Sequence, residues 1–388
     1  MVAETVYVFG AGINRSVKDY VQNLRPPLAT DLFKQALRHE MLNESGRQEL
    51  EDLFAYIWRY WRYSVEDLRE EPFDLEACFT MLQQQRIEAD ADGDKRQKEM
   101  ISQIEDHLTA LLTRYLAYIE LFSDTASDLG KVGNQVLAER AAVLTFNYDT
   151  IVESAIEAAV GTTDESPPEE GTVPDERLSY SEYKWNRALA YGVRFQEVHI
   201  QQNMGVVLAP VMGERFYGHP DNELYPTPIL KLHGSLNWFI HTSRHSRPNA
   251  YGSTKNPKEG SVVLASGYPH VRHGFGPPED LDSWILRPMI VTPVLYKDLV
   301  GKGVVGQSWR RARKELSTCR RLVVAGYSFP PTDFATRRLF LEAFADSPPK
   351  ELVSVNPSRS VAGEAAFLCH FRNKPLVREN LEEFFEHP

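Results

Sequence analysis

The stretch Val143-Leu144-Thr145-Phe146-Asn147-Tyr148-Asp149 carries the pattern that decides the fold. It is a short apolar run that ends abruptly in polar residues. The same pattern recurs at 229–235, which reads ILKLHGS, and at 322–328, which reads LVVAGYS. Such runs are typical of strands that are buried on both faces, as in parallel sheets. We therefore predict an α/β fold with a Rossmann-like, mostly parallel sheet, helices on both faces and a helical insertion.

Polar residues follow these runs at the point where each predicted strand ends. In open parallel sheets, ligands bind beyond the carboxyl ends of the strands, where loops and helix N-termini meet. Asn147 and His233 occupy that position in two of the three stretches. We therefore expect both side chains at the centre of the binding crevice.

Composition and charge exclude several classes of protein. The chain has 388 residues, of which 42% are hydrophobic and 25% charged, as in ordinary globular proteins. Its net charge of -11 argues against direct binding of nucleic acid. The apolar runs are too short to span a membrane, and no signal peptide is recognisable, so a cytoplasmic location is expected. The three cysteines, Cys78, Cys319 and Cys369, form no C-x-x-C pair, so neither zinc nor another metal is predicted.

The chain is predicted to form a single domain, 1–388, with three insertions. Residues 44–122 show apolar side chains at helical spacing and are interpreted as a helical insertion between the first two strands. Residues 161–227 and 241–281 are interpreted as loop-rich insertions, because 161–179 and 241–281 contain many Pro, Gly and polar residues. The rest of the first stretch is mixed and includes short strand-like pieces such as 205–208.

A glycine-containing turn follows the first predicted strand, 5–9. It reads Gly10-Ala11-Gly12-Ile13-Asn14-Arg15, with Arg15 in the place of the third glycine of a dinucleotide-binding motif. Glycines here would let a pyrophosphate approach the backbone, and an unrelated tight turn is the alternative. The loop at 25–31, which ends in Asp31, could fold over a bound nucleotide or be a proline-stiffened connection.

The candidate catalytic side chains each have a structural alternative. The carboxamide of Asn147 could hold a ribose hydroxyl or a water, or it could only form a turn. Asp149 could stabilise a developing cation, or it could only begin the helix that a Thr150–Glu153 capping box opens. His233 suits proton transfer near neutral pH, and Gly234 after it is expected to leave space for a ligand.

Two further strand ends complete the candidate site. Gly326, Tyr327 and Ser328 follow one apolar run, and their backbone and hydroxyl groups could receive a phosphate. Asn356 follows the run at 351–355, where its side chain suits an adenosine ribose.

Taken together and in this order, five motifs resemble the sirtuin-like domain of bacterial antiphage-defence proteins. They are GAGI at 10–13, TFNYD at 145–149, KLHG at 231–234, GYS at 326–328 and VNP at 355–357. The resemblance implies a Rossmann-like domain that binds NAD, with the Gly10 and Gly326 loops on the phosphates and Asn356 near the adenine ribose. It also implies catalytic roles for the residues at 147 and 233.

The sequence departs from protein-deacylating sirtuins in lacking four zinc cysteines and in having Arg25-Pro26-Pro27-Leu28 in place of an aspartate-phenylalanine-arginine loop. Both departures favour members that hydrolyse NAD outright. The resemblance therefore implies an NAD glycohydrolase that depletes NAD in defence, as a homo-oligomer that could pair with a HerA-type hexameric DNA translocase ATPase. The alternatives are an NAD-dependent deacylase or ADP-ribosyltransferase, and a non-catalytic scaffold that senses NAD or ADP-ribose.

Overall fold

The computed structural model describes residues 3–18, 20–38, 42, 44–123, 129–160, 190–193, 196–201, 205–209, 227–242, 262–266, 285–292 and 303–386. Its centre is a six-stranded sheet in the order β11-β10-β9-β1-β2-β5, and every pairing in it is parallel. The strands are β1 (Thr5–Phe9), β2 (Ala142–Thr145), β5 (Ile229–Lys231), β9 (Arg321–Ala325), β10 (Glu351–Val355) and β11 (Leu376–Arg378).

The strand order identifies the fold. Within this sheet the chain runs outward from β1 through β2 to β5, then returns to the other side of β1 and runs through β9 and β10 to β11. This is the doubly wound order of Rossmann folds, whose direction reverses between β1 and β9. The predicted Rossmann-like parallel sheet is therefore confirmed.

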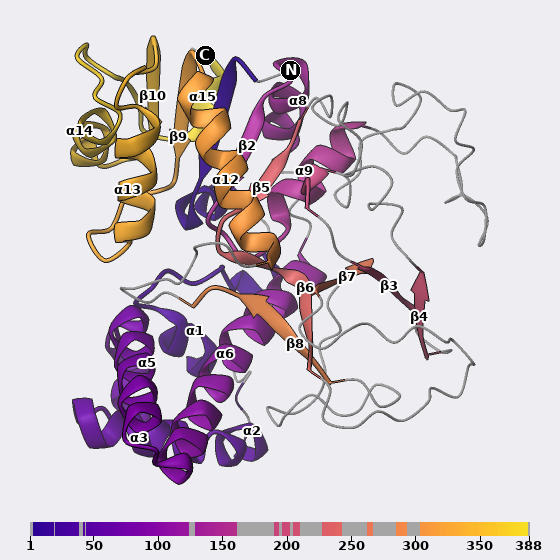
Figure 1. Ribbon diagram of the computed structural model, residues 1–388, viewed down its shortest axis with the longest axis vertical. Coiled ribbons are helices and arrows are strands. Elements are labelled where there is room, and N and C mark those ends of the chain that lie inside the picture. The colour runs from indigo at the N-terminus through magenta and orange to yellow at the C-terminus, as the bar shows by residue number, and fades with distance from the viewer. Residues whose placement is uncertain are drawn as a thin grey trace.

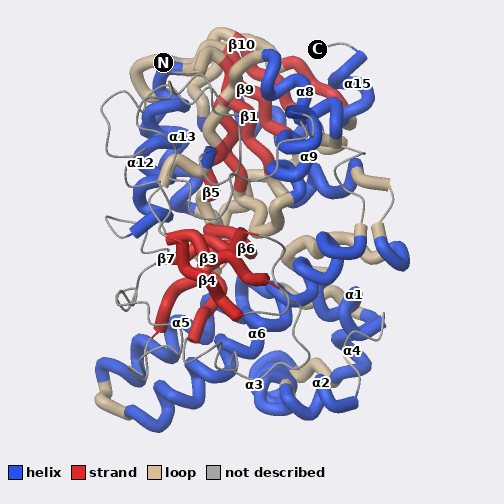
Figure 2. The backbone as a smooth tube through the Cα atoms, turned by 90° about the vertical axis from the view of Figure 1, so that its right-hand side faces the viewer, coloured by secondary structure: helices blue, strands red, loops and turns tan. Residues whose placement is uncertain are grey.

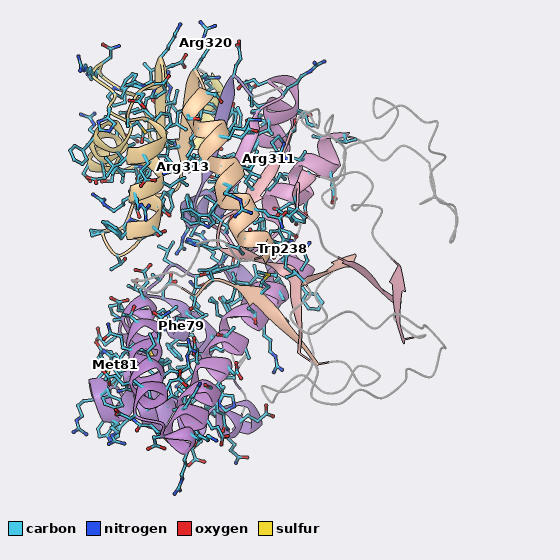
Figure 3. All side chains as sticks on the ribbon, in the orientation of Figure 1. Phe79, Met81, Trp238, Arg311, Arg313 and Arg320 are labelled. Atoms are coloured by element: carbon cyan, nitrogen blue, oxygen red, sulfur yellow. The ribbon has the colours of Figure 1, made fainter. Side chains whose placement is uncertain are left out.

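Helices cover both faces of the sheet. Because side chains alternate along a strand, each strand contributes residues to the core on either face. Tyr7 and Phe9 of β1 pack in one core with α8 (Gly130–Ala138), α9 (Ile151–Val160) and α15 (Leu381–Glu386). Val6 and Val8 pack in a second core with α12 (Gly303–Thr318), α13 (Phe334–Ala343) and α14 (Arg359–Leu368). Figure 3 marks Arg311 and Arg313, two of the basic side chains of α12.

A bundle of helices lies between β1 and β2 in sequence. It forms the end of the molecule opposite the parallel sheet (Figure 1). It consists of α1 (Leu32–Arg38), α2 (Glu44–Glu49), α3 (Glu51–Trp61), α4 (Val65–Glu70), α5 (Leu75–Ala91) and α6 (Lys95–Phe122). Apolar side chains such as Ile57, Phe79 and Leu108 fill its interior. Trp58, which helical spacing places beside that face, is instead 51% exposed.

A second sheet, whose strands lie between β2 and β9 in sequence, packs beside the bundle (Figure 2). Its order is β4-β3-β7-β6-β8, and it is mixed, with β3 and β7 parallel and the other pairs antiparallel. The strands are β3 (Gln196–Gln201), β4 (Gly205–Ala209), β6 (Gly234–Thr242), β7 (Val262–Ser266) and β8 (Ile285–Ile290). Three of them lie in the stretches interpreted as loop-rich, most of whose remaining residues fall outside the described part of the chain.

The last strand of the parallel sheet is not predicted by the apolar pattern of the sequence. Leu376–Arg378 is a strand, β11, which pairs with β10 and closes the edge of the parallel sheet. Three residues are too few to show an alternating or apolar pattern, so the strand exists only because β10 offers it a partner. In the part of the chain that the structure describes, no helix is both long and apolar enough to cross a membrane.

Candidate functional site

Two glycine loops meet at the point where the strand order reverses. The amide of Gly10 donates to the carbonyl of Ala325 at 3.1 Å, and that of Gly12 donates to the carbonyl of Gly326 at 2.8 Å. A Cβ on Gly10 or Gly12 would lie 2.7 Å from the backbone of Gly326, which itself has a φ of 66°. The glycines therefore bring two loops into backbone contact. The residues after Gly10 form a 3-10 segment, Ala11–Ser16, and not the α-helix that usually follows such a turn.

Asn147 joins the end of β2 to the Gly10 loop. Its side-chain Nδ2 donates to the carbonyl of Gly10 at 3.3 Å, and its own amide donates to the hydroxyl of Thr145 at 3.1 Å. The residue is buried. Asn147 therefore has a structural role, because its side chain links two loops. It also lies just beyond the carboxyl end of a strand, the position where ligands bind in parallel sheets.

Asp149 is tied to the first motif through Asn14. Nδ2 of Asn14 donates to Oδ2 of Asp149 at 2.8 Å, and the amide of Ile151 donates to the other carboxylate oxygen at 3.3 Å. Oδ1 of Asn14 is buried and has no hydrogen-bond partner among the described residues. Burial raises the pKa of Asp149, an effect that the nearby charge of Lys231 opposes. The pairing brings together two of the predicted site residues from segments far apart in sequence.

A cluster of buried charged side chains lies next to Asp149. Lys231, at the end of β5, forms a 3.0 Å ion pair with Glu153 of α9 and also donates to the main-chain carbonyl of Asp149. Glu120 of α6 accepts hydrogen bonds from the amide and hydroxyl of Thr150. Burial, followed by the charge of Asp149, raises the pKa of Glu120 to about 7.

This cluster corrects the predicted capping box at the start of α9. In a capping box the amide of Thr150 would donate to Glu153, three positions further on. That amide donates to Glu120 instead, at 3.0 Å, and Glu153 pairs with Lys231. The two residue types of the motif are present, but the amide of Thr150 bonds to Glu120 of α6 and the carboxylate of Glu153 pairs with Lys231 of β5.

His233 lies in the two-residue turn between β5 and β6, so it stands where the parallel sheet passes into the second sheet. The side chain is buried against aromatic rings, with ring centroids 5.1 Å from Phe146 and 6.2 Å from Tyr148. Its carbonyl accepts from the amide of Val291 at 2.7 Å, which fixes the backbone of the turn.

Gly234 does not leave space for a ligand, so that prediction is wrong. Its φ is 79°, and a Cβ there would lie 2.1 Å from the carbonyl oxygen of Met289 in β8. The glycine is therefore required by the close approach of β6 and β8 and by its left-handed backbone.

Asp333 is the residue of the site that sequence reasoning missed. Its Oδ2 lies 3.4 Å from Nε2 of His233, and both side chains are nearly buried. Asp333 also caps α13, accepting from the amide of Thr336 at 3.3 Å. An aspartate before a predicted helix is the usual signal of a cap, and nothing in the sequence connects it with a histidine 100 positions earlier.

Other predicted cofactor-binding residues have structural contacts of their own. Asp31 pairs with Arg15 at 2.9 Å. The ring of Tyr327 stacks on Phe146, with centroids 4.1 Å apart, and Ile13 is a core residue. Oδ1 of Asn356 accepts from the amide of Ser358 at 2.9 Å, which stabilises the turn after β10.

The predicted cofactor-binding residues nevertheless lie in a row along the carboxyl ends of the strands, as an extended ligand would require. Ala11 is half-buried and Ser328 is exposed, and they follow β1 and β9 respectively. Asn356 follows β10, which is four strand positions from β5. At about 4.8 Å per strand, the ends of β10 and β5 are therefore about 19 Å apart.

The described residues contain no group of three or more His, Cys, Asp or Glu side chains that could hold a metal ion. The three cysteines are buried and are not joined by a disulfide. Among the remaining histidines, His245, His270 and His273 lie outside the described residues, and His241 is described only as part of the backbone of β6.

Comparison with known proteins gives limited results. No family model matches the chain, and no curated protein matches it. A solved structure concerned with the mechanism and regulation of Sir2 enzymes is 12% identical, with a TM-score of 0.39, over 97% of this chain and 87% of that one. A structure of Sir2Tm bound to a propionylated peptide is 11% identical, with a TM-score of 0.34, over 98% of this chain and 89% of that one. The fold assignment therefore rests on the strand order.

Proposed function

We propose that this chain is an NAD glycohydrolase of the sirtuin-like type, which cleaves the bond between nicotinamide and ribose to give nicotinamide and ADP-ribose. The observation that carries the proposal is that Asn147, Asp149 and His233 each contact a residue that follows β1 or β9, the two strands at the reversal point. Asn147 contacts Gly10, Asp149 contacts Asn14, and His233 contacts Asp333. The reversal point is where Rossmann folds bind dinucleotides. The five sequence motifs support the same assignment.

The described residues fit such a substrate in two respects. The buried Oδ1 of Asn14 is an acceptor without a partner among them, next to the carboxylate of Asp149. Buried acceptors normally receive a hydrogen bond, and the amide group of nicotinamide or a ribose hydroxyl would supply the donor. The approximate 19 Å between the ends of β10 and β5 suits a dinucleotide that lies along the sheet edge.

The chemistry asks little of acid catalysis. Nicotinamide leaves as a neutral molecule from a cationic ring, so the breaking bond needs no proton. Water forms the new bond to the ribose carbon and must lose a proton. In this proposal His233 accepts that proton, Asn147 orients the ribose or the water, and Asp149 steadies the positive charge that develops on the sugar.

The test is nicotinamide release from NAD by the purified chain, followed by chromatography with and without an acylated peptide. We expect release without peptide and equal amounts of nicotinamide and ADP-ribose. A His233→Ala protein purified in the same way controls for contaminating hydrolases. Release that requires the peptide would indicate a deacylase, and NAD binding without release would indicate a scaffold.

We further propose, from the sequence motifs, that the enzyme acts in antiphage defence as a homo-oligomer whose activity rises on contact with a HerA-type ATPase. Exposed apolar side chains on the helical bundle, Trp58, Ile87 and Met100, are compatible with a contact surface. Light scattering combined with the activity assay, with and without the ATPase, tests this. A monomer that is fully active alone would contradict it.

A further inference from the structure

Asp333 uses its two carboxylate oxygens for different purposes. Oδ1 accepts the amide of Thr336, which is all that capping α13 requires. Oδ2 accepts the hydroxyls of Tyr327 and Thr336, each at 2.8 Å, and lies 3.4 Å from Nε2 of His233. The contact with His233 is therefore additional to the cap.

The loop that presents Asp333 is held in one conformation. Phe329 has a φ of 51°, which is unfavourable for a bulky residue and persists only where the surroundings determine it. Its ring packs between Tyr327 and Phe340, with centroids 4.9 and 5.0 Å away. The amide of Asp333 closes a turn onto the carbonyl of Pro330 at 3.0 Å. Packing thus fixes where the carboxylate stands.

We propose that Asp333 is a positioning residue for His233, holding the imidazole in place and stabilising its protonated form. The inference rests on the proposed function, in which His233 accepts a proton from water. A neutral imidazole that directs Nε2–H at a carboxylate carries its acceptor lone pair on Nδ1. Once the ring has taken the proton, the negative charge of Asp333 stabilises the imidazolium.

Among the described residues, the other titratable groups that interact with Asp333 or its loop are Tyr148, Tyr327 and Glu76. Burial raises the pKa of both tyrosines, so their hydroxyls remain protonated donors, Tyr148 to the carbonyl of Val291 and Tyr327 to Asp333. Glu76 reaches the same loop from α5 and accepts from the hydroxyl of Thr332. Asp333 is thus the carboxylate in contact with the ring, and Glu76 is a second negative charge near it.

The main test replaces Asp333 with serine, which also caps helices but carries no charge. Asp333→Ser should lower kcat by about 10–100-fold, less than the full contribution of a general base, with a small change in KM. The acid limb of the pH–activity profile should move to lower pH, because an imidazole without a nearby carboxylate is harder to protonate. Asp94→Ser is the matched control, because Asp94 caps α6 far from the site.

A second measurement does not depend on NAD. The ring protons of His233, assigned by their loss in His233→Gln, are titrated by NMR in the protein without substrate. The midpoint should be lower by about 1 pH unit or more in Asp333→Ser. It should fall less in Glu76→Gln and stay unchanged in Asp94→Ser. Should the serine variant fail to fold, Asp333→Asn removes the same charge and keeps the shape and the capping ability of the side chain.

The two measurements separate the two proposals. An unshifted midpoint in a folded, uncharged variant overturns the role of Asp333, even if the wild type cleaves NAD. If the His233 midpoint shifts in Asp333→Ser but the wild-type protein never cleaves NAD, the contact is supported and the proposed hydrolase is rejected. A loss of activity in which the pH profile keeps its acid limb would mean that Asp333 only caps α13, and would also overturn the proposal.

Discussion

At the reversal point between β1 and β9 the contacts are made by backbone, whereas on the β2–β5 side they are made by buried charged side chains. Gly10, Gly12 and Gly326 pack main chain against main chain. Lys231 and Glu153, by contrast, are almost fully buried side chains from different elements. The first set of contacts is possible only because glycines lack a Cβ. The second is stable only because each buried charge is paired with an opposite one. The following substitutions test each side separately.

The largest effect is expected on the charged side. Lys231→Met should lower the free energy of unfolding by about 3–5 kcal/mol, because it leaves the buried Glu153 without its cation. Urea denaturation of both proteins measures this. Adding Glu153→Gln should recover part of the loss while keeping an acceptor for the hydroxyl of Tyr191. A cost of less than 1 kcal/mol for the single change would show that the pair is not a structural requirement.

On the same side, His233→Ala should separate chemistry from folding. Nicotinamide release should fall by about 10²–10⁴-fold, the usual contribution of a general base. The thermal unfolding temperature should change little, because the backbone contact of the turn with Val291 does not involve the side chain. Near wild-type turnover in a folded variant would remove His233 from the mechanism.

At the reversal point, Gly326→Ala should destabilise the protein by about 2–4 kcal/mol. The residue has a φ of 66°, and a Cβ would meet the amide nitrogen of Ile13 at 2.2 Å. Gly363→Ala is the matched control: it lies inside α14, and no atom beyond its neighbouring helix backbone lies within 4 Å of its Cβ position, so it should stabilise by about 0.5–1 kcal/mol. Equal effects of the two changes would contradict the close-packing argument.

The smallest effect concerns pH and sharpens the account of the charged side. The pKa of Glu120 is raised from 4.5 to about 7, so its protonated form favours the folded state. Its contribution to stability is full below pH 4.5 and is lost as the pH rises through 7.

Glu120→Gln should therefore unfold with a weaker pH dependence than the wild type between pH 5 and pH 8. Urea midpoints at a series of pH values in this range give the comparison. A glutamine keeps an acceptor for the amide of Thr150, and the threonine hydroxyl can turn to accept from its NH₂ group. Parallel pH profiles for the two proteins would show that Glu120 stays ionised in the fold.

The sequence predicted the parallel sheet because its strands have unmistakable apolar runs. Val143–Thr145, 229–231 and 322–325 are buried on both faces, so their pattern needs no knowledge of partners. The bundle was predictable for a related reason, since helical spacing is a local property. Residues 376–378 and 262–266 are strands that pairing determines, and they were missed.

The chain by itself therefore determined which residues stand at strand ends, because burial on both faces leaves a direct mark on composition. Asn147, Asp149 and His233 were placed on this basis alone. Only the tertiary structure decided their neighbours: Asn14 against Asp149, Glu120 against Thr150, and Asp333 against His233. These contacts join elements far apart in sequence. The strand order sets the first and the third by bringing the carboxyl ends of the strands to one end of the sheet, and Glu120 reaches Thr150 from α6 of the bundle. Spacing along the chain carries no record of that order.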